Sequence, residues 1–559
     1  MPRIGSAPNW IVSLLHTIKV LQGDLCHRWH ALMWACLCIA TVLLANGCKQ
    51  GGSSGTASTS LDPPNEPDPP GDVPAFPLLD HVDQADIATL RILFNELFVL
   101  GDELFEAQFN GLDGAGILRL PDGTDFSDRF ARIPPGGGRL GGPNAQACEA
   151  CHNQPFGTAA GEASSNVLQD PAMVGASPFN VRNPPSLFGS AVMQRLTEEM
   201  TEDLIAIRDE AKAATTPRGP TVTRSLTTKG IDFGKIHATQ DSMGTVTLDT
   251  SDVDGIDPDL VLRPYGWKGN VTTLRDFVRS AAFTELGMEA DELVAKDPMG
   301  RSDPDGDGVE SELSVGDITA LTIYIGAQEI PTTLEFLVAG GFVPPPSADI
   351  ANAIARGENL FSQIGCADCH VPELQLDDPR FDEPTMRGDG NYFDTDIDPV
   401  ATSLRADQPA SFNLARDGDF PRLQPNSEGG VRVGLFGDLK RHNMGAQLAD
   451  AQPTASLNAN GTPLMVGGGS VTIGVQVFLT PELWGVADTG PWLHDGRAGT
   501  LNEAILLHGV DSPLAVGAPA RSEAQEARDA FAALSADDQA AVVEFLKSLR
   551  HFELEEEDE

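Results

Sequence analysis

The sequence predicts a mainly α-helical protein made of two domains, with loop-rich and short β insertions. Three observations support this fold class. Apolar residues recur at helical spacing in several segments of the chain. The pattern Cys-x-x-Cys-His occurs twice, at residues 148–152 and 366–370. The three prolines at 344–346 form a natural hinge between the two copies, so we expect an N-terminal domain over 75–343 and a C-terminal domain over 344–559.

Helical periodicity sets the elements expected in each domain. A helix over 84–108 should lead toward the first motif, after which the glycine-rich stretch 136–143 breaks regular structure. Short strands and loops are expected up to about residue 263. The remaining helices that the pattern predicts lie at 191–213, 273–293, 315–325, 347–361 and 523–549.

A short phrase occurs in both halves of the chain. Residues 183–189 read Asn-Pro-Pro-Ser-Leu-Phe-Gly, and residues 479–485 read Leu-Thr-Pro-Glu-Leu-Trp-Gly. In each half the motif also follows a predicted helix. We interpret these parallels as a distant internal duplication.

The first 74 residues have the composition of a leader and a tether. The apolar run 31–45 is short for a membrane span but suits the hydrophobic region of a signal peptide. The sequence that ends at Cys48 resembles a bacterial lipoprotein cleavage box, with plain secretory cleavage as the alternative. Residues 1–47 are therefore expected to be a signal peptide, Cys48 the lipidated residue and 48–74 a flexible tether. The expected location is the periplasm or the outer membrane, with a lipid anchor as the attachment to the membrane.

The formal net charge of −44 limits the choice of partners. Nucleic-acid binding would require a basic surface, so it is disfavoured. A strongly acidic surface can instead attract cationic partners, although it is equally explained as a solvated surface.

The two motifs account for every cysteine beyond the leader and its cleavage site. Cys-x-x-Cys-His is compatible with a redox dithiol, half a zinc site or a covalently attached c-type haem. A thioredoxin-like dithiol would need a βαβ context, and zinc would need two further ligands nearby. Haem attachment needs only the residues present, and they form two sets: Cys148, Cys151 and His152, and Cys366, Cys369 and His370.

Residues 480–509 resemble the C-terminal segment of bacterial di-haem cytochrome c peroxidases and of methylamine-utilisation di-haem enzymes. They are most similar to the related di-haem oxidoreductases labelled as peroxidases or thiol oxidoreductases. The resemblance covers roughly residues 80–555 and includes the phrases at 263–269 and 438–445. It implies two cytochrome c-like haem domains and a haem-dependent, peroxidase-like oxidoreductase. The alternative is a non-catalytic di-haem electron-transfer lipoprotein.

The resemblance also implies how the two haems would work. Electrons would enter at the C-terminal haem, from a donor such as a small cationic cytochrome c. Peroxide or another small oxidant would react at the N-terminal haem.

The resemblance places a distal ligand on the C-terminal haem. In the peroxidases this ligand is a Met fourteen residues after the His of a His-Asp-Gly phrase, and fourteen residues after His494 this chain has His508. His370 and His508 would then be the two axial ligands. His442 and Met444 are the competing candidates. His494 itself is expected to position neighbouring groups or to contact a haem propionate.

The N-terminal haem lacks an equivalent ligand. The peroxidases carry a switchable histidine sixteen residues after the motif's His, where this chain has Leu168. The departure suggests an open or weakly held iron at His152. The alternatives for the sixth ligand are Met173, Met193, His81 and His237.

Cleavage of an O–O bond would also need an acid–base group near the open iron. Glu198, Glu199 and Glu285 are the candidates for this role. Arg182 could stabilise a propionate or a peroxide-derived charge, and an ordinary salt bridge explains it equally well.

An acidic loop forms the third motif. Asp303, Asp305 and Asp307, followed by Gly308, match positions 1, 3, 5 and 6 of a calcium-binding loop. Ser314 stands where the bidentate Glu is expected, so Glu312 would have to substitute for it. Calcium is the expectation, and a solvated acidic turn is the alternative.

Overall fold

The computed structural model describes residues 81–115, 145–155, 160–161, 165–168, 179–295, 300–304, 308–383, 410–418, 420–427, 429–458, 463–511 and 521–553. All of them lie in the unit that extends from Pro74 to Glu559. The predicted signal peptide, the tether and Cys48 fall outside these ranges. In the described ranges, no helix has both the length and the apolar composition that crossing a membrane requires.

The expectation of a mainly α fold is wrong. Helix accounts for 33% of the structure and strand for 18%. Among the described residues the strands form one three-stranded sheet and seven two-stranded sheets. Most of these strands have only two to four residues, and many contain the β-branched residues Val, Ile and Thr, which favour an extended backbone.

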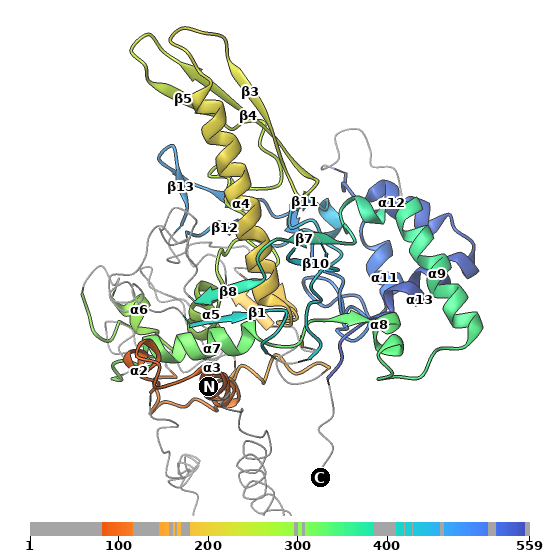
Figure 1. Ribbon diagram of the computed structural model, residues 1–559, viewed down its shortest axis with the longest axis horizontal. Coiled ribbons are helices and arrows are strands. Elements are labelled where there is room, and N and C mark those ends of the chain that lie inside the picture. Colours follow the sequence, from red (N-terminus) through yellow and green to blue (C-terminus); the bar gives the residue numbers. More distant parts are fainter. Residues whose placement is uncertain are drawn as a thin grey trace, which may run out of the picture. The chain divides into compact units, whose positions relative to one another are not determined.

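Most helices lie close to the positions that periodicity predicts, whereas those at 334–339 and 501–506 were not predicted (Figure 1). The α-helices are α2 (Gln84–Ala88), α3 (Phe94–Glu106), α4 (Ser190–Ala213), α5 (Leu274–Ala281), α6 (Asp291–Val294), α7 (Val315–Gly326), α8 (Leu334–Ala339), α9 (Ala348–Gln363), α11 (Leu501–Leu506), α12 (Gln525–Ala532) and α13 (Ala536–Leu546). A π-helix, η1 (Ala282–Leu286), continues α5, and two 3₁₀ turns are η2 (Cys366–Asp368) and η3 (Ala446–Leu448).

Three of the expected helices are divided in the structure. The helix expected over 273–293 runs through α5 and η1 and stops at Gly287, which has a φ of 77°, before α6 begins. The helix expected over 84–108 is interrupted at Leu90, whose φ of 57° is left-handed and cannot continue a right-handed helix. The helix expected over 523–549 divides into α12 and α13. Ser535 begins α13, because its side chain accepts a hydrogen bond from the N–H of Asp538.

The three-stranded sheet extends beside the C-terminal end of α4 (Figure 1). Strand β4 is central and pairs antiparallel with both β3 and β5. The strands are β1 (Ser165–Leu168), β2 (Phe179–Arg182), β3 (Val222–Thr228), β4 (Ile231–Gln240), β5 (Val246–Asp249), β6 (Thr332–Thr333), β7 (Leu374–Leu376), β8 (Arg380–Glu383), β9 (Ala410–Asn413), β10 (Val431–Val433), β11 (Arg441–Asn443), β12 (Thr454–Ala455), β13 (Met465–Val466), β14 (Gly469–Ser470), β15 (Thr472–Ile473), β16 (Val477–Leu479) and β17 (Leu549–Arg550).

Helix α3 crosses helix α7 at a close approach that depends on a glycine. A Cβ atom on Gly101 would lie 2.5 Å from Cβ of Tyr324 and 2.8 Å from the carbonyl carbon of Ala320. One turn further along α3, the ring of Phe105 lies 5.4 Å from the ring of Tyr324 and 6.4 Å from that of His152. The helix crossing therefore supports the histidine of the first motif.

The same arrangement occurs where α9 crosses α13. A Cβ atom on Gly357 would lie 2.5 Å from the carbonyl carbon of Ala541 and 2.8 Å from Cβ of Phe545. Phe361, one turn after Gly357, lies 5.3 Å from the ring of Phe545 and 6.4 Å from that of His370. The interplanar angles of the two Phe–His pairs are 53° and 50°. This repeated geometry supports the internal duplication.

The two copies of the repeated phrase pack close to each other. Gly189, which has a φ of 76°, leaves room for the indole of Trp484, since a Cβ atom there would lie 2.7 Å from Cη2. Gly485 has a φ of 71° and lies against the ring of His551. The ring of His551 in turn lies 4.9 Å from that of Phe188. Each phrase thus ends in a glycine that an aromatic side chain covers.

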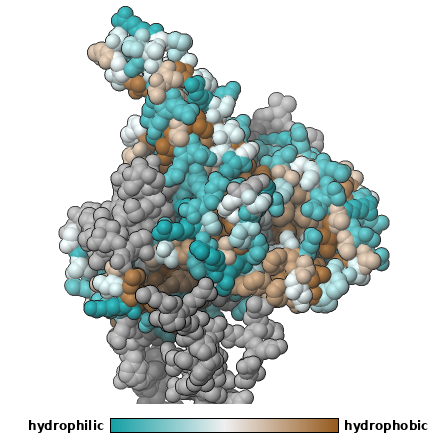
Figure 2. Space-filling view, viewed as in Figure 1, coloured by the Kyte–Doolittle hydropathy of each residue, from teal (hydrophilic) through white to brown (hydrophobic). Residues whose placement is uncertain are grey.

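Two clusters of buried apolar side chains form the cores. The smaller one surrounds the second motif and includes Phe361, Phe436 and Phe545, with Cys366 packed against it. The larger one contacts Cys148 and extends from Val82 to Trp484, so it includes apolar residues of β7–β10 from the C-terminal half. Figure 2 shows hydrophilic residues over much of the visible face, as the acidic composition leads us to expect.

Candidate functional site

The second motif follows directly on α9. The helix ends at Gln363, Gly365 takes a left-handed turn with a φ of 88°, and Cys366 begins η2. His370 Nδ1 lies 3.1 Å from the carbonyl oxygen of Phe436. A carbonyl can only accept a hydrogen bond, so Nδ1 carries the proton and Nε2 of the neutral ring is unprotonated.

His508 follows the C-terminal end of α11 and has the same tautomer. Its Nδ1 lies 2.8 Å from the carbonyl oxygen of Ala504, one turn earlier. The carbonyl again fixes the proton on Nδ1 and leaves Nε2 unprotonated. Both imidazoles are therefore prepared to bind a metal through Nε2, with a backbone carbonyl as the orienting partner.

Both histidines line one cavity of about 560 Å³. This volume lies within the range of about 300–1,000 Å³ that is typical of ligand and cofactor sites. The cavity wall also includes Cys366, Cys369 and Phe361. None of the four cysteines of the two motifs forms a disulfide, so both thiols of the second motif are available. Two thiols and two imidazoles around an apolar cavity fit a covalently attached haem.

The electrostatics of the cavity keep both imidazoles neutral. Burial, together with the neighbouring His508, lowers the pKa of His370 to about 4. Burial also lowers the pKa of His508. A metal binds only the neutral ring, so these shifts favour coordination near pH 7.

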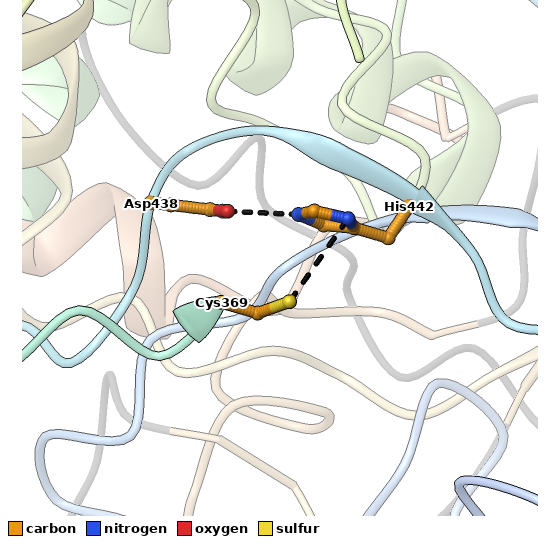
Figure 3. Close-up of side chains that lie close together, drawn as sticks. All are labelled: Cys369, Asp438 and His442. Atoms are coloured by element: carbon orange, nitrogen blue, oxygen red, sulfur yellow. Dashed lines mark hydrogen bonds and ion pairs between the residues drawn. The ribbon is translucent and has the colours of Figure 1, made fainter. Parts of the chain in front are cut away.

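His442, one of the competing ligands, has both ring nitrogens occupied. Nε2 lies 2.8 Å from a carboxylate oxygen of Asp438, and Nδ1 lies 2.7 Å from one of Glu523 (Figure 3 shows the Asp438 side). Burial lowers the pKa of His442, but the hydrogen bond to Asp438 and the contact with Cys369 raise it to about 11. A doubly hydrogen-bonded imidazolium has no lone pair for iron, so the geometry disfavours His442 as a ligand. Met444 also lines the cavity.

Cys369, His442 and Asp438 also form a cysteine–histidine–carboxylate constellation (Figure 3). His442 Nδ1 lies 4.0 Å from the sulfur of Cys369. In a catalytic arrangement the histidine would accept the thiol proton. A protonated His442 cannot do so, and it acts here as a cation beside the sulfur.

The first motif lies in a turn within residues 145–155. The backbone N–H groups of Cys151 and His152 both donate to the carbonyl of Cys148, at 3.1 Å. Burial raises the pKa of the Cys148 thiol to about 12. Burial and the carboxylate of Glu285 raise the pKa of Cys151. Glu285, on η1, is therefore the acid–base candidate that the structure brings near the first motif.

The other catalytic candidates lie in ion pairs elsewhere. Glu198 is buried and pairs with Arg195. Glu199 pairs with Lys229 at 2.6 Å and accepts hydrogen bonds from two backbone N–H groups of the chain after β7. Arg182, at the end of β2, makes a bidentate ion pair with Asp450, at 2.7 and 2.8 Å. The structure does not gather these residues around one point.

The candidates for the sixth ligand of the first haem are dispersed. His81 lies 2.7 Å from Asp317 at the start of α7. His237 is on β4, between Thr223 at 2.8 Å and Asp252 at 2.9 Å. Met193, on α4, lines the cavity that contains His370, Leu168 is on β1, and Met173 lies outside the described residues.

Sequence reasoning missed the central role of Asp450. Its carboxylate is 2% exposed and contacts Arg182, Lys268 at 3.0 Å and His494 at 3.4 Å. Burial raises its pKa, but Arg182 and Lys268 outweigh burial and the net shift is downward. Burial lowers the pKa of His494 to about 4, so this ring is neutral. An isolated Asp in a loop gives no sequence signal for such a cluster.

The acidic loop is only partly described. Asp303 accepts a hydrogen bond from the N–H of Gly308 at 3.1 Å, whereas Asp305 and Asp307 lie outside the described residues. Glu312 is buried and accepts a hydrogen bond from the N–H of Glu289. In the part of the chain that is described, the one group of residues with metal-ligand spacing is Cys369, Asp438 and His442.

Comparisons with known proteins bear on the second half of the chain. Residues 423–549 match the family described as "di-haem oxidoreductase, putative peroxidase". A similar solved structure is described as a MauG-like protein associated with microbial copper homeostasis. It is 18% identical, the match covers 56% of this chain and 76% of that chain, and the TM-score of 0.25 is too low to support an argument. No curated protein matches the chain. Residues 423–549 include β11, His494 and His508, and over these residues the predicted resemblance to di-haem oxidoreductases is confirmed.

Proposed function

We propose that this protein is an exported di-haem c-type cytochrome with peroxidase-like oxidoreductase activity. The observation that carries the proposal is the cavity in which Cys366, Cys369, His370 and His508 meet, with Nε2 free on both rings. The match of residues 423–549 to the di-haem oxidoreductases supports the same function.

Each residue of the second site has a role in holding the haem. Cys366 and Cys369 would form the two thioether bonds, and His370 and His508 would bind the iron. The carbonyls of Phe436 and Ala504 keep both rings in the coordinating tautomer. The haem would supply reversible one-electron chemistry here. With two histidines available to hold the iron, this site would suit electron entry rather than reaction with peroxide.

The first site is proposed as the reaction centre. Cys148 and Cys151 would anchor the haem, and His152 would bind its iron from one side. Glu285 is assigned the proton transfer that O–O bond cleavage requires. Its carboxylate lies close enough to Cys151 to raise the pKa of that thiol. Glu198, Glu199 and Arg182 are assigned structural roles, since each already has a charged partner.

The proposed donor is a small cationic cytochrome c. A formal net charge of −44 would steer such a partner toward the protein, and the association rate should fall as ionic strength rises. Export is proposed from the predicted signal peptide at 1–47, and anchoring from the predicted lipidation of Cys48. Calcium at Asp303, Asp305 and Asp307 is proposed from the spacing of these residues alone, with Glu312 as the weakest member of the set because its carboxylate faces a backbone N–H.

Spectra of the oxidised, reduced and carbon monoxide-treated protein test the proposal. We expect two covalently bound haems, of which one binds carbon monoxide after reduction, and peroxide-dependent oxidation of a reduced cytochrome c. If neither haem binds carbon monoxide and the protein has no peroxidase activity, the electron-transfer alternative is supported. Absence of covalent haem would refute both functions.

A variant tests the ligand assignment. His508→Met should retain both haems and raise one of the two midpoint potentials, because a thioether ligand favours the reduced iron. His237→Met, on the distant strand β4, is the matched control and should change neither potential. Unchanged potentials in His508→Met would exclude His508 as a ligand.

A further inference from the structure

Glu482 places an ionisable carboxyl group in the wall of the haem cavity. The residue lies between Pro481 and Leu483 in the second copy of the repeated phrase, and it lines the same cavity as His370 and His508. The corresponding position in the first copy is Ser186, so the carboxyl is a feature of the second site.

One short loop connects Glu482 to the histidine of the motif. The Leu483 N–H donates to the carbonyl of Leu435 at 2.9 Å, and Cα of Glu482 lies 3.7 Å from the position that a Cβ atom on Gly437 would occupy. In the same loop, the carbonyl oxygen of Phe436 accepts the hydrogen bond from Nδ1 of His370. Glu482 is therefore separated from His370 by residues 435–437.

The other acidic groups around the cavity are paired or face the solvent. Asp438, at the end of the loop, and Glu523 both pair with His442. Asp368 and Glu526 line the cavity but are exposed. Among the described residues, the carboxyl group of Glu482 has no hydrogen-bond or ion-pair partner other than its own backbone N–H.

The cationic groups that line the cavity pair with other carboxylates than Glu482. His442 pairs with Asp438 and Glu523, and Arg528 pairs with Asp511 and Asp529. Tyr265, which also lines the cavity, donates its hydroxyl to the carbonyl of Ser190 at 2.9 Å, and burial raises its pKa well above the usual value. His494 is neutral near pH 7 because burial lowers its pKa to about 4. Burial correspondingly raises the pKa of Glu482 to about 7. A half-buried carboxyl in the wall of a largely apolar cavity responds to a change of charge nearby.

We propose that Glu482 takes up a proton when the haem held by His370 and His508 is reduced. The inference rests on the proposed function, which places that haem in this cavity. One electron from the donor cytochrome converts ferric to ferrous iron, and one proton from water converts the Glu482 carboxylate to the carboxylic acid. The electron and the proton together leave the net charge of the cavity unchanged.

The proposal predicts a pH-dependent midpoint potential for this haem. Ferrous iron carries one positive charge fewer, so the carboxyl should hold its proton more tightly in the reduced protein than in the oxidised one. Between these two pKa values the potential should fall as the pH rises. The limiting slope is a tenfold change in the reduction equilibrium per pH unit, or about 59 mV for a one-electron couple.

Spectroelectrochemical titration of the holoprotein between pH 5.5 and 8.5 tests the proposal. We expect the slope in the wild type and in Glu482→Asp, which keeps a titratable group. Glu482→Gln should show a potential that is nearly independent of pH and that lies above the wild type at pH 8.5. Glu526→Gln, an exposed change in the wall of the same cavity, should keep the wild-type slope.

The outcomes separate this inference from the proposed function. A Glu482→Gln protein that retains the slope overturns the proposal, and so does a wild type without a slope; in both cases the di-haem assignment stands if two haems titrate. A protein with no haem at Cys366 and Cys369 would overturn the proposed function and this inference with it. Haem content and circular dichroism of each variant show whether a changed slope reflects misfolding.

Discussion

Replacing Gly357 by Ala tests the helix crossing that supports the second motif. The added methyl group would lie 2.5 Å from the carbonyl carbon of Ala541 and 2.8 Å from Cβ of Phe545. Carbon atoms prefer separations of about 3.5–4.0 Å, so α9 and α13 would have to move apart by about 1 Å. Overpacking of this kind typically costs about 1–3 kcal/mol, and we take the upper end because a backbone group is involved. Ala gains about 1 kcal/mol over Gly in a helix interior, which leaves a net loss of about 2 kcal/mol.

Urea denaturation of the wild type and the variant measures this loss as a lower free energy of unfolding. The matched control is Gly111→Ala, where an added Cβ atom meets nothing within 4 Å and the change should stay within about 0.5 kcal/mol. Gly101→Ala should repeat the loss at the crossing of α3 with α7. A Gly357→Ala protein as stable as the wild type, or more stable, would show that the two helices do not cross in this close contact.

Three further predictions concern groups outside the cavity. Asp450→Asn should lower the free energy of unfolding by about 3–5 kcal/mol in urea at pH 7, because Arg182 and Lys268 would keep buried positive charges without a carboxylate partner. The folded-state pKa of Asp450 lies below its usual value of 3.8, so its stabilisation is present above that pH and is lost as the pH falls through the depressed pKa. The difference between wild type and Asp450→Asn should therefore shrink as the pH falls below about 3.8, and a constant difference would contradict the ion-pair account. Ser535→Ala should destabilise α13 by about 1 kcal/mol, since the N–H of Asp538 would lose its cap, and denaturation with unchanged stability would argue against the cap.

The helices of the fold could be predicted from the sequence because their signals are local. The apolar spacing located α4, α7 and α9 well, and these helices need no information from distant residues. The breaks within the helices expected over 84–108, 273–293 and 523–549 were missed. Ser535 followed by Asp538 is a capping signal that a closer reading could have found. The left-handed Leu90 has no such signal, because nothing about a Leu predicts a positive φ.

The short strands are harder to predict for a physical reason. Most have two to four residues, too few for an alternating pattern to stand out. Some of them form hairpins, and others pair segments that are far apart in the sequence. Strands β6 and β17, for example, are separated by more than two hundred residues. The mainly α expectation failed because it counted periodic segments and ignored pairing between short ones.

The candidate site, like the fold, could be predicted from the sequence only where the signal is local. The two Cys-x-x-Cys-His motifs are local patterns, and the resemblance located His508. The carbonyls of Phe436 and Ala504, which fix the ring tautomers, and the charges around Asp450 depend on tertiary contacts. Glu482 could be seen in the repeated phrase, but the absence of a charged partner among the described residues could only be known from the structure.

The larger core has a consequence for how the two iron sites would communicate. Buried side chains that follow the second motif, among them Leu376, Phe381 and Val433, belong to the same core as the helices around the first motif. A fragment that began at residue 344 would expose this apolar surface to water and would tend to aggregate. In the intact chain, moving the two motifs apart would require this core to open. Electron transfer between them should then be independent of solvent viscosity, unlike transfer between domains that must first approach one another.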